Sequence, residues 1–153
     1  MARDRFVLPI PKISSSPRPS DPQLVRLPIW LAIAHDIWHP YMSTASAGGI
    51  TATARATPVR VAWVMGDGAI VVCLGPGTRY RDGKDDPRRS SPTCGHTYLE
   101  SSAEAPHARY RVTATVTWSV TWSAIGQSGT LPALTTTAAT SFRVAESQAI
   151  VTS

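Results

Sequence analysis

The clearest pattern along the chain is an alternation of apolar and polar residues between Tyr110 and Trp122. A period of two is typical of a β-strand with one face buried and the other in water. An extended segment of this length spans about 40 Å, which is long for one small sheet, so we expect a bulge or bend partway. The side chains expected to share the buried face are Tyr110, Val112, Ala114, Val116, Trp118, Val120 and Trp122.

Shorter apolar segments predict further strands, separated by turns that contain Gly and Pro. Pro28 marks the first strand as an edge or a bulged strand, and Pro58 interrupts another. The Asp67-Gly68 pair is a strong hairpin signal. A second hairpin is expected at residues 126–129. The expected strands are residues 24–33, 50–56, 59–65, 69–74, 110–122 and 130–151, and Val59, Val61, Trp63 and Met65 are expected to share one face.

The composition changes near residue 24. Residues 1–23 are rich in Pro and Ser, which favour extended, unpaired backbone and offer little to bury. After them Thr, Val, Ala and Ser are plentiful, the good helix formers are scarce, and no segment has helical periodicity. We therefore expect an all-β protein: a disordered linker over residues 1–23, followed by one antiparallel β-sandwich domain over residues 24–152.

The net charge of +5 raises the question of nucleic-acid binding. Residues 1–30 hold five basic residues against two acidic ones, so most of the excess lies at the N-terminus, and the chain has no block of Lys and Arg. We expect no nucleic-acid partner. Residues 27–34 are apolar but too short to span a bilayer, and the sequence after them does not fit a signal peptide. We expect no membrane span, and an export signal supplied by a longer chain.

Cys73 and Cys94 are the only cysteines, and they flank a loop that has little else to hold it. The all-β framework, the loop between them and the absence of other ligands at zinc spacing favour a disulfide over two free thiols. A disulfide in a small β-sandwich indicates an oxidising compartment. The sequence therefore predicts a Cys73–Cys94 bridge and a secreted or cell-surface protein.

Three short motifs occur in a fixed order: Trp63-Val64-Met65-Gly66-Asp67-Gly68, then His96-Thr97-Tyr98, then a strand that begins Tyr110-Arg111-Val112-Thr113. In this order they resemble the PKD domain, an immunoglobulin-like β-sandwich of bacterial surface and secreted proteins. Val64 and Met65 depart from the usual Asp and Phe of that motif. The longer stretch from Leu24 to Val151 is similar to a group of secreted bacterial proteins of unassigned function.

The resemblance implies structural roles for the motif residues Trp63, Gly66, Asp67, Gly68, His96, Thr97 and Tyr98. Trp63 and Trp118 are expected to fill the space between two sheets. Asp67 is expected to bond neighbouring amides in its turn, and His96 to bond backbone. Tyr98 is expected to act as a corner residue whose hydroxyl bonds backbone across the loop.

The chain offers few candidate catalytic or metal-binding residues. Asp82, Asp85 and Asp86 could offer oxygen ligands to Ca²⁺, but four arginines surround them, so we expect a solvated mixed-charge loop. His35 and His39 have a helical metal spacing without a helix or a third ligand. We expect no metal, no cofactor and no catalytic residues. The aromatic residues Trp38, Tyr41 and Tyr80 are candidate ligand contacts, although Trp residues of a sandwich are more often core.

The expected function is a non-catalytic extracellular module for spacing, adhesion or protein binding at the cell surface. One alternative is a carbohydrate- or cell-wall-binding module that uses exposed aromatic side chains. Another is an accessory domain of a larger secreted hydrolase or nucleotide-handling protein. The partner would be a protein or a polysaccharide at the cell surface, and an exposed sheet edge could also support weak self-association.

Overall fold

In the computed structural model, residues 6–146 are described, and within them the fold is all-β without an α-helix. Two single-turn 3-10 helices occur at His35–Ile37 and Pro106–Ala108. The strands are β1 (Ile13–Ser16), β2 (Gln23–Leu24), β3 (Pro28–Ile33), β4 (Tyr41–Ala47), β5 (Ile50–Val64), β6 (Ile70–Cys73), β7 (Gly95–Thr97), β8 (Tyr110–Ala124), β9 (Gln127–Phe142) and β10 (Val144–Ala145).

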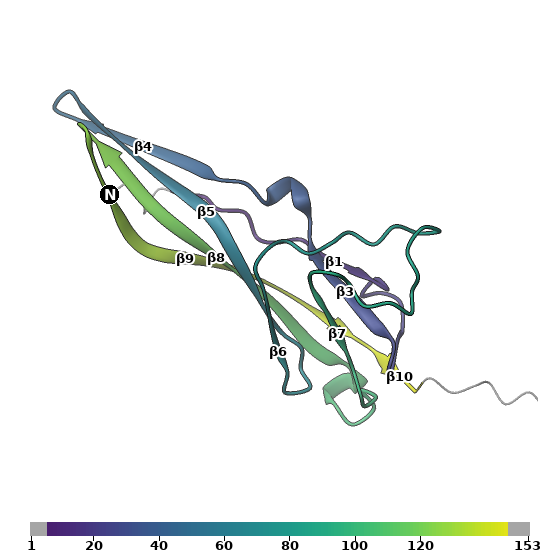
Figure 1. The fold of residues 1–153 in the computed structure, drawn as a ribbon. Helices are drawn as coiled ribbons and strands as arrows, with labels where there is room; N and C mark the ends of the chain where they lie inside the picture. The colour runs from purple at the N-terminus through teal and green to yellow at the C-terminus, as the bar shows by residue number, and fades with distance from the viewer. Residues whose placement is uncertain (1–5, 147–153) are drawn as a thin grey trace, which may run out of the picture.

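Two antiparallel sheets build the fold. The larger sheet has the order β4-β5-β8-β9, with β6 also paired to β5, and the smaller sheet has the order β1-β3-β7. The short strands β2 and β10 form a parallel pair. The β4–β5 and β8–β9 hairpins reach well beyond the smaller sheet (Figure 1). The expected all-β antiparallel fold is confirmed, and it is compatible with an immunoglobulin-like sandwich.

Alternate residues of facing strands form the core. Val61 and Trp63 of β5 are fully buried, and Ile29, Leu31 and Ile33 of β3 join the same cluster from the smaller sheet. Each such side chain contributes roughly 1.5–3 kcal/mol through removal of its apolar surface from water. The expected inward faces are largely confirmed: Met65, Tyr110, Val112, Ala114, Val116, Trp118 and Val120 are buried, whereas Val59 and Trp122 are half-buried.

Two bulges bend the long strands. In β8 the register against β9 shifts between Trp118 and Val120, which confirms the expected irregularity. The interruption expected at Pro58 is wrong, because β5 continues through it and absorbs the break as a register shift between Pro58 and Arg60. A proline has no N–H to donate, but a bulge removes the need for that bond in the ladder. The second hairpin turns at Ile125–Gly126, one residue earlier than expected.

The N-terminal segment differs from the sequence expectation. Ile13–Ser16 forms β1 and pairs with β3, and Gln23 is fully buried, so the expected unpaired linker over residues 1–23 is wrong for this part. Pairing with a distant strand overrides the local preference of a Ser-rich segment for open backbone. The first expected strand is divided into β2 and β3, and Arg26 between them has a positive φ of 70°. Residues 1–5 and 147–152 of the expected linker and domain lie outside the described residues.

A disulfide connects the two layers. Cys73 ends β6 in the larger sheet, Cys94 directly precedes β7 in the smaller one, and their Cα atoms are 5.7 Å apart. The predicted Cys73–Cys94 bridge is confirmed, and both residues belong to the core cluster. Residues 74–94, called the long loop below, therefore start at one sheet and end covalently fixed beside the other.

Candidate functional site

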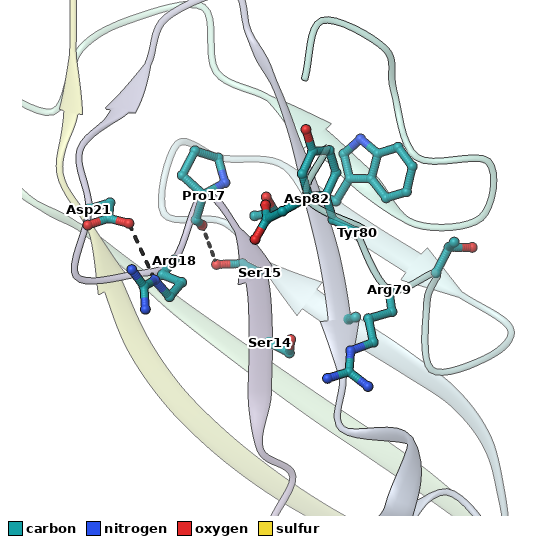
Figure 2. A pocket seen from close by; sticks show the side chains of 12 residues that line it. Ser14, Ser15, Pro17, Arg18, Asp21, Arg79, Tyr80 and Asp82 are labelled. Carbon is teal, nitrogen blue, oxygen red and sulfur yellow. Dashed lines mark hydrogen bonds and ion pairs between the residues drawn. The ribbon is translucent and has the colours of Figure 1, made fainter. Parts of the chain in front are cut away.

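A groove lies on the face of the smaller sheet that points away from the core. Its floor consists of Ser14 and Ser16 of β1 and their cross-strand partners Ala32 and Trp30 of β3. Its volume is about 480 Å³, which lies within the usual range of ligand pockets. One wall is the N-terminal part of the long loop, from Thr78 to Asp82, and the other is the segment of residues 17–21 (Figure 2).

The wall formed by residues 17–21 is held from beneath by a buried glutamine. The Nε2 atom of Gln23 donates to the carbonyl oxygens of Arg18 and Asp21 at 2.9 and 3.0 Å. The hydroxyl of Ser15 donates to the carbonyl oxygen of Pro17 at 2.7 Å. Buried polar side chains with several backbone partners fix a loop strongly, because breaking one such bond strands a polar group away from water. This wall is therefore preorganised.

The long loop is fixed to β3 along its length. The backbone amide of Ile33 donates to the carbonyl oxygen of Pro76, and the backbone amide of Leu31 donates to the carbonyl oxygen of Cys94. Gly77 has a φ of +91°, and a Cβ at this position would lie 2.2 Å from the carbonyl oxygen of Leu31. Only glycine combines this backbone conformation with such a close approach. Backbone N–H groups of a strand point along the plane of its sheet. The start and the end of the loop therefore lie along the edge of β3 as closely as a further strand would.

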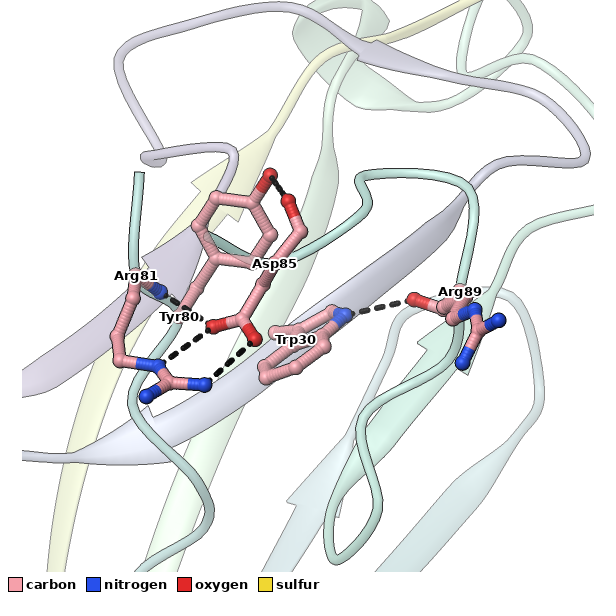
Figure 3. Close-up of polar contacts among 5 residues, drawn as sticks. All are labelled: Trp30, Tyr80, Arg81, Asp85 and Arg89. Atoms are coloured by element: carbon pink, nitrogen blue, oxygen red, sulfur yellow. Dashed lines mark hydrogen bonds and ion pairs between the residues drawn. The ribbon is translucent and has the colours of Figure 1, made fainter. Parts of the chain in front are cut away.

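Trp30 anchors the middle of the long loop (Figure 3). The residue is only 6% exposed although its side chain points away from the core, and its Nε1 donates to the carbonyl oxygen of Arg89 at 2.7 Å. The ring of Tyr80 packs edge-to-face on it, with centroids 5.1 Å apart. The Tyr80 hydroxyl donates to the carbonyl oxygen of Asp85. Desolvation, and then the nearby carboxylates, raise the pKa of Tyr80.

Arginines neutralise two of the three aspartates that the sequence grouped in this loop. Arg81 donates to the Asp85 carboxylate from its guanidinium at 3.2 Å and from its backbone amide at 2.7 Å, and these bonds, the first above all, lower the pKa of Asp85. Arg88 contacts Asp86 at 3.4 Å, and its backbone amide lowers the pKa of that carboxyl group. Within residues 6–146 no group of His, Cys, Asp or Glu side chains is arranged to hold a metal ion.

Arg79 and Asp82 are two charged side chains that line the groove and are not part of these arginine–aspartate pairs. In the described part of the chain neither side chain has a hydrogen bond or an ion pair, and both extend from the long loop toward β1 (Figure 2). On the opposite wall Arg18 and Asp21 form an exposed pair at 3.5 Å. The groove therefore offers one unpaired cation and one unpaired carboxylate above a floor of serine hydroxyl groups.

The three aromatic residues proposed as ligand contacts do not form one surface. Tyr80 lines the groove, whereas Tyr41 stacks on His39 at 4.3 Å and packs edge-to-face on Trp118 at 5.5 Å. Trp38 is half-buried and packs against the core cluster. Desolvation and the Asp36 carboxylate raise the pKa of Tyr41. Two of the three side chains therefore mainly extend the core.

The motif residues form a polar corner at the end of the sandwich. Trp63 and Tyr98 are fully buried, and the hydroxyl of Tyr98 donates to the carbonyl oxygen of Met65 at 2.7 Å, as expected of a corner residue. Burial strongly raises the pKa of Tyr98. Asp67, in the turn between Gly66 and Gly68, accepts a hydrogen bond from the amide of Ala69 at 3.0 Å, also as expected.

The expected role of His96 is corrected. Its Nε2 atom lies 2.8 Å from Oδ2 of Asp67 rather than against backbone. The ring is oriented by an edge-to-face contact with Tyr98, with centroids 4.7 Å apart. Thr97 lies in β7 opposite Pro28. The corner therefore joins the turn after β5 to β7 through side chains, and it serves the architecture rather than the groove.

Sequence reasoning missed Ser14, Arg18 and Arg79 as groove residues. They come from segments about sixty residues apart in the chain, and only the pairing of β1 with β3 brings them together.

Within residues 6–146 no helix is long and apolar enough to cross a membrane. No protein-family model, curated protein or solved structure matches this chain.

Proposed function

We propose that this chain is a non-catalytic β-sandwich module that works outside the cell and binds a protein partner at the cell surface. The groove between β1 and the long loop is the observation that carries this proposal. Both of its walls are held by part-buried hydrogen bonds from Gln23, Ser15, Trp30 and Tyr80, so a ligand would meet a preformed surface and lose little free energy to ordering it. Unpaired charges in a preformed groove favour recognition of a specific partner.

The extracellular part of the proposal rests on the disulfide. A bridge between Cys73 and Cys94 is stable in oxidising compartments and rare in the cytosol. The order of the Gly66-Asp67-Gly68 turn, the His96-Thr97-Tyr98 segment and β8 supports membership of the PKD-like class. The hydrogen bond from the Tyr98 hydroxyl to the carbonyl oxygen of Met65 supports the architectural role that the resemblance implies for Tyr98.

A binding experiment on intact cells tests the proposal. Biotinylated protein is added to cells of the organism that makes it, and the bound protein is measured. The wild type is compared with a Ser14→Trp variant, in which the new indole fills the groove. Thr44→Trp is the matched control, because Thr44 is exposed on β4 of the larger sheet. We expect the wild type and Thr44→Trp to bind equally, Ser14→Trp to bind at least about tenfold more weakly, and protease treatment of the cells to abolish binding.

Two results would overturn the proposal. Equal binding by Ser14→Trp would remove the groove from the function. Binding that survives protease treatment and transfers to purified cell-wall polysaccharide would favour a carbohydrate-binding module instead. The half-exposed Tyr80 ring beside the Asp82 carboxylate favours this rival, since sugar hydroxyl groups donate to carboxylates and sugar faces pack on aromatic rings.

A further inference from the structure

The groove continues into a smaller cavity at each end. One cavity of about 340 Å³ shares Ser14, Ala32 and Arg79 with it, and the other, of about 110 Å³, shares Trp30 and Tyr80. Together they follow the outer face of β3 from Ile33 to Pro28. Six residues of a strand span about 20 Å, so this path accommodates an extended chain of about the same number of residues.

The charges along this path alternate in sign. Asp36 lines the cavity at one end, Arg79 lies where that cavity meets the groove, and Asp82 lines the groove itself. In the described chain these three side chains form no ion pairs with one another or with other residues. A guanidinium forms paired hydrogen bonds with a carboxylate. The two flanking carboxylates repel a ligand that carries several negative charges.

The other end of the path is apolar. Its lining includes Leu24, Leu27 and four prolines around the Tyr80 ring. Proline-rich and aromatic surfaces hold proline or aliphatic side chains of extended peptides through shape and burial rather than through charge. The path therefore changes from alternating charge at the Asp36 end to apolar contact at the Tyr80 end.

From this arrangement we propose that the groove binds an extended peptide segment of the partner, with an acidic side chain against Arg79. Basic side chains flank that acid next to Asp36 and Asp82, and a proline or aliphatic residue occupies the Tyr80 end. This inference rests on the proposed function and names the ligand of the same groove. A peptide fits better than a sugar, because Trp30 is covered and the Tyr80 hydroxyl is already bonded internally.

Selection from a random seven-residue peptide library displayed on phage tests this directly. The baits are the wild type, Arg79→Glu and the control Arg60→Glu, which changes an exposed arginine of β5 outside the groove. We expect the wild type and Arg60→Glu to select peptides with a central Asp or Glu between basic residues. We expect Arg79→Glu to lose these peptides and to bind the synthetic consensus about tenfold more weakly. Equal thermal unfolding of the three proteins checks their folding.

Several outcomes would overturn the inference. They are a consensus without an acid, a consensus that Arg79→Glu retains, undiminished binding of the consensus peptide to Ser14→Trp, or displacement of that peptide by cell-wall oligosaccharides. If one of these occurs while protease-sensitive binding to cells still depends on Ser14, only the ligand assignment fails. If cell binding does not depend on Ser14, the proposed function fails as well.

Discussion

Gly77→Ala tests whether the long loop is seated on β3 as closely as the structure has it. The new Cβ would lie 2.2 Å from the carbonyl oxygen of Leu31 and 2.9 Å from the Cα atom of Ala32. Both are backbone atoms of a central strand, so the loop has to move by about 1 Å to restore ordinary contact. Gly75→Ala is the matched control, because its Cβ would meet nothing within 4 Å.

The expected magnitude follows from two contributions. A non-glycine residue at positive φ costs about 1–2 kcal/mol, and overpacking against fixed neighbours costs about 1–3 kcal/mol. We therefore expect Gly77→Ala to lower the free energy of unfolding by about 2–5 kcal/mol. Gly75→Ala should change it by less than about 0.5 kcal/mol, as is usual for open surface positions.

Urea unfolding of the oxidised proteins measures both values. A midpoint decrease of about 1–3 M is expected for Gly77→Ala, given the usual denaturant dependence of a domain of this size. Local detachment of the loop would appear as increased acrylamide quenching of tryptophan fluorescence, because Trp30 would lose its cover. Unfolding curves and quenching that match those of Gly75→Ala would refute the close seating of the loop on β3.

Three further predictions concern the corner, the disulfide and the ionisation of the tyrosines. Tyr98→Phe leaves the buried carbonyl oxygen of Met65 without its donor and should cost about 1–3 kcal/mol in urea unfolding; a change below about 0.3 kcal/mol would contradict this. Replacing both Cys73 and Cys94 by Ala should cost about 3 kcal/mol, and intact mass should increase by about 2 Da on reduction of the wild type; free thiols in the native protein would exclude the bridge. All four tyrosines have raised pKa values in the folded state, so the stability they contribute is present below pH 10 and is lost as the pH rises above it. Ultraviolet absorbance measures tyrosine ionisation, and ionisation of all four at their ordinary pKa would contradict this.

The sequence predicted those parts of the fold that local patterns determine. The alternation from Tyr110 to Trp122 identified β8 and its buried face, and the two cysteines identified their bridge. The motif order indicated a corner role for Tyr98, whose hydroxyl donates to the carbonyl oxygen of Met65. The first two features depend on residues close in the chain or on a pair with no competing partner, and the third on the order of known motifs, so a single sequence contains enough information.

Features that depend on distant pairing were not predictable in the same way. The Ser-rich strand β1 has no strong strand signal of its own and exists because β3 offers it a partner. The groove needs that strand, the wall held by Gln23 and the long loop at once. His96 was expected to bond backbone because nothing in the sequence indicates that Asp67 lies opposite its ring.

The bulge between β8 and β9 has a consequence for solubility. Strand β9 is 16 residues long and pairs only with β8 among the described strands, so its outer edge resembles a template for strands of other molecules. Residues 132 and 133 lie opposite Ser119 at the register shift, and Pro132 has no backbone N–H to donate. An incoming strand would meet a break in the ladder there, which divides the exposed edge of β9 into two shorter segments and disfavours growth of a long intermolecular sheet.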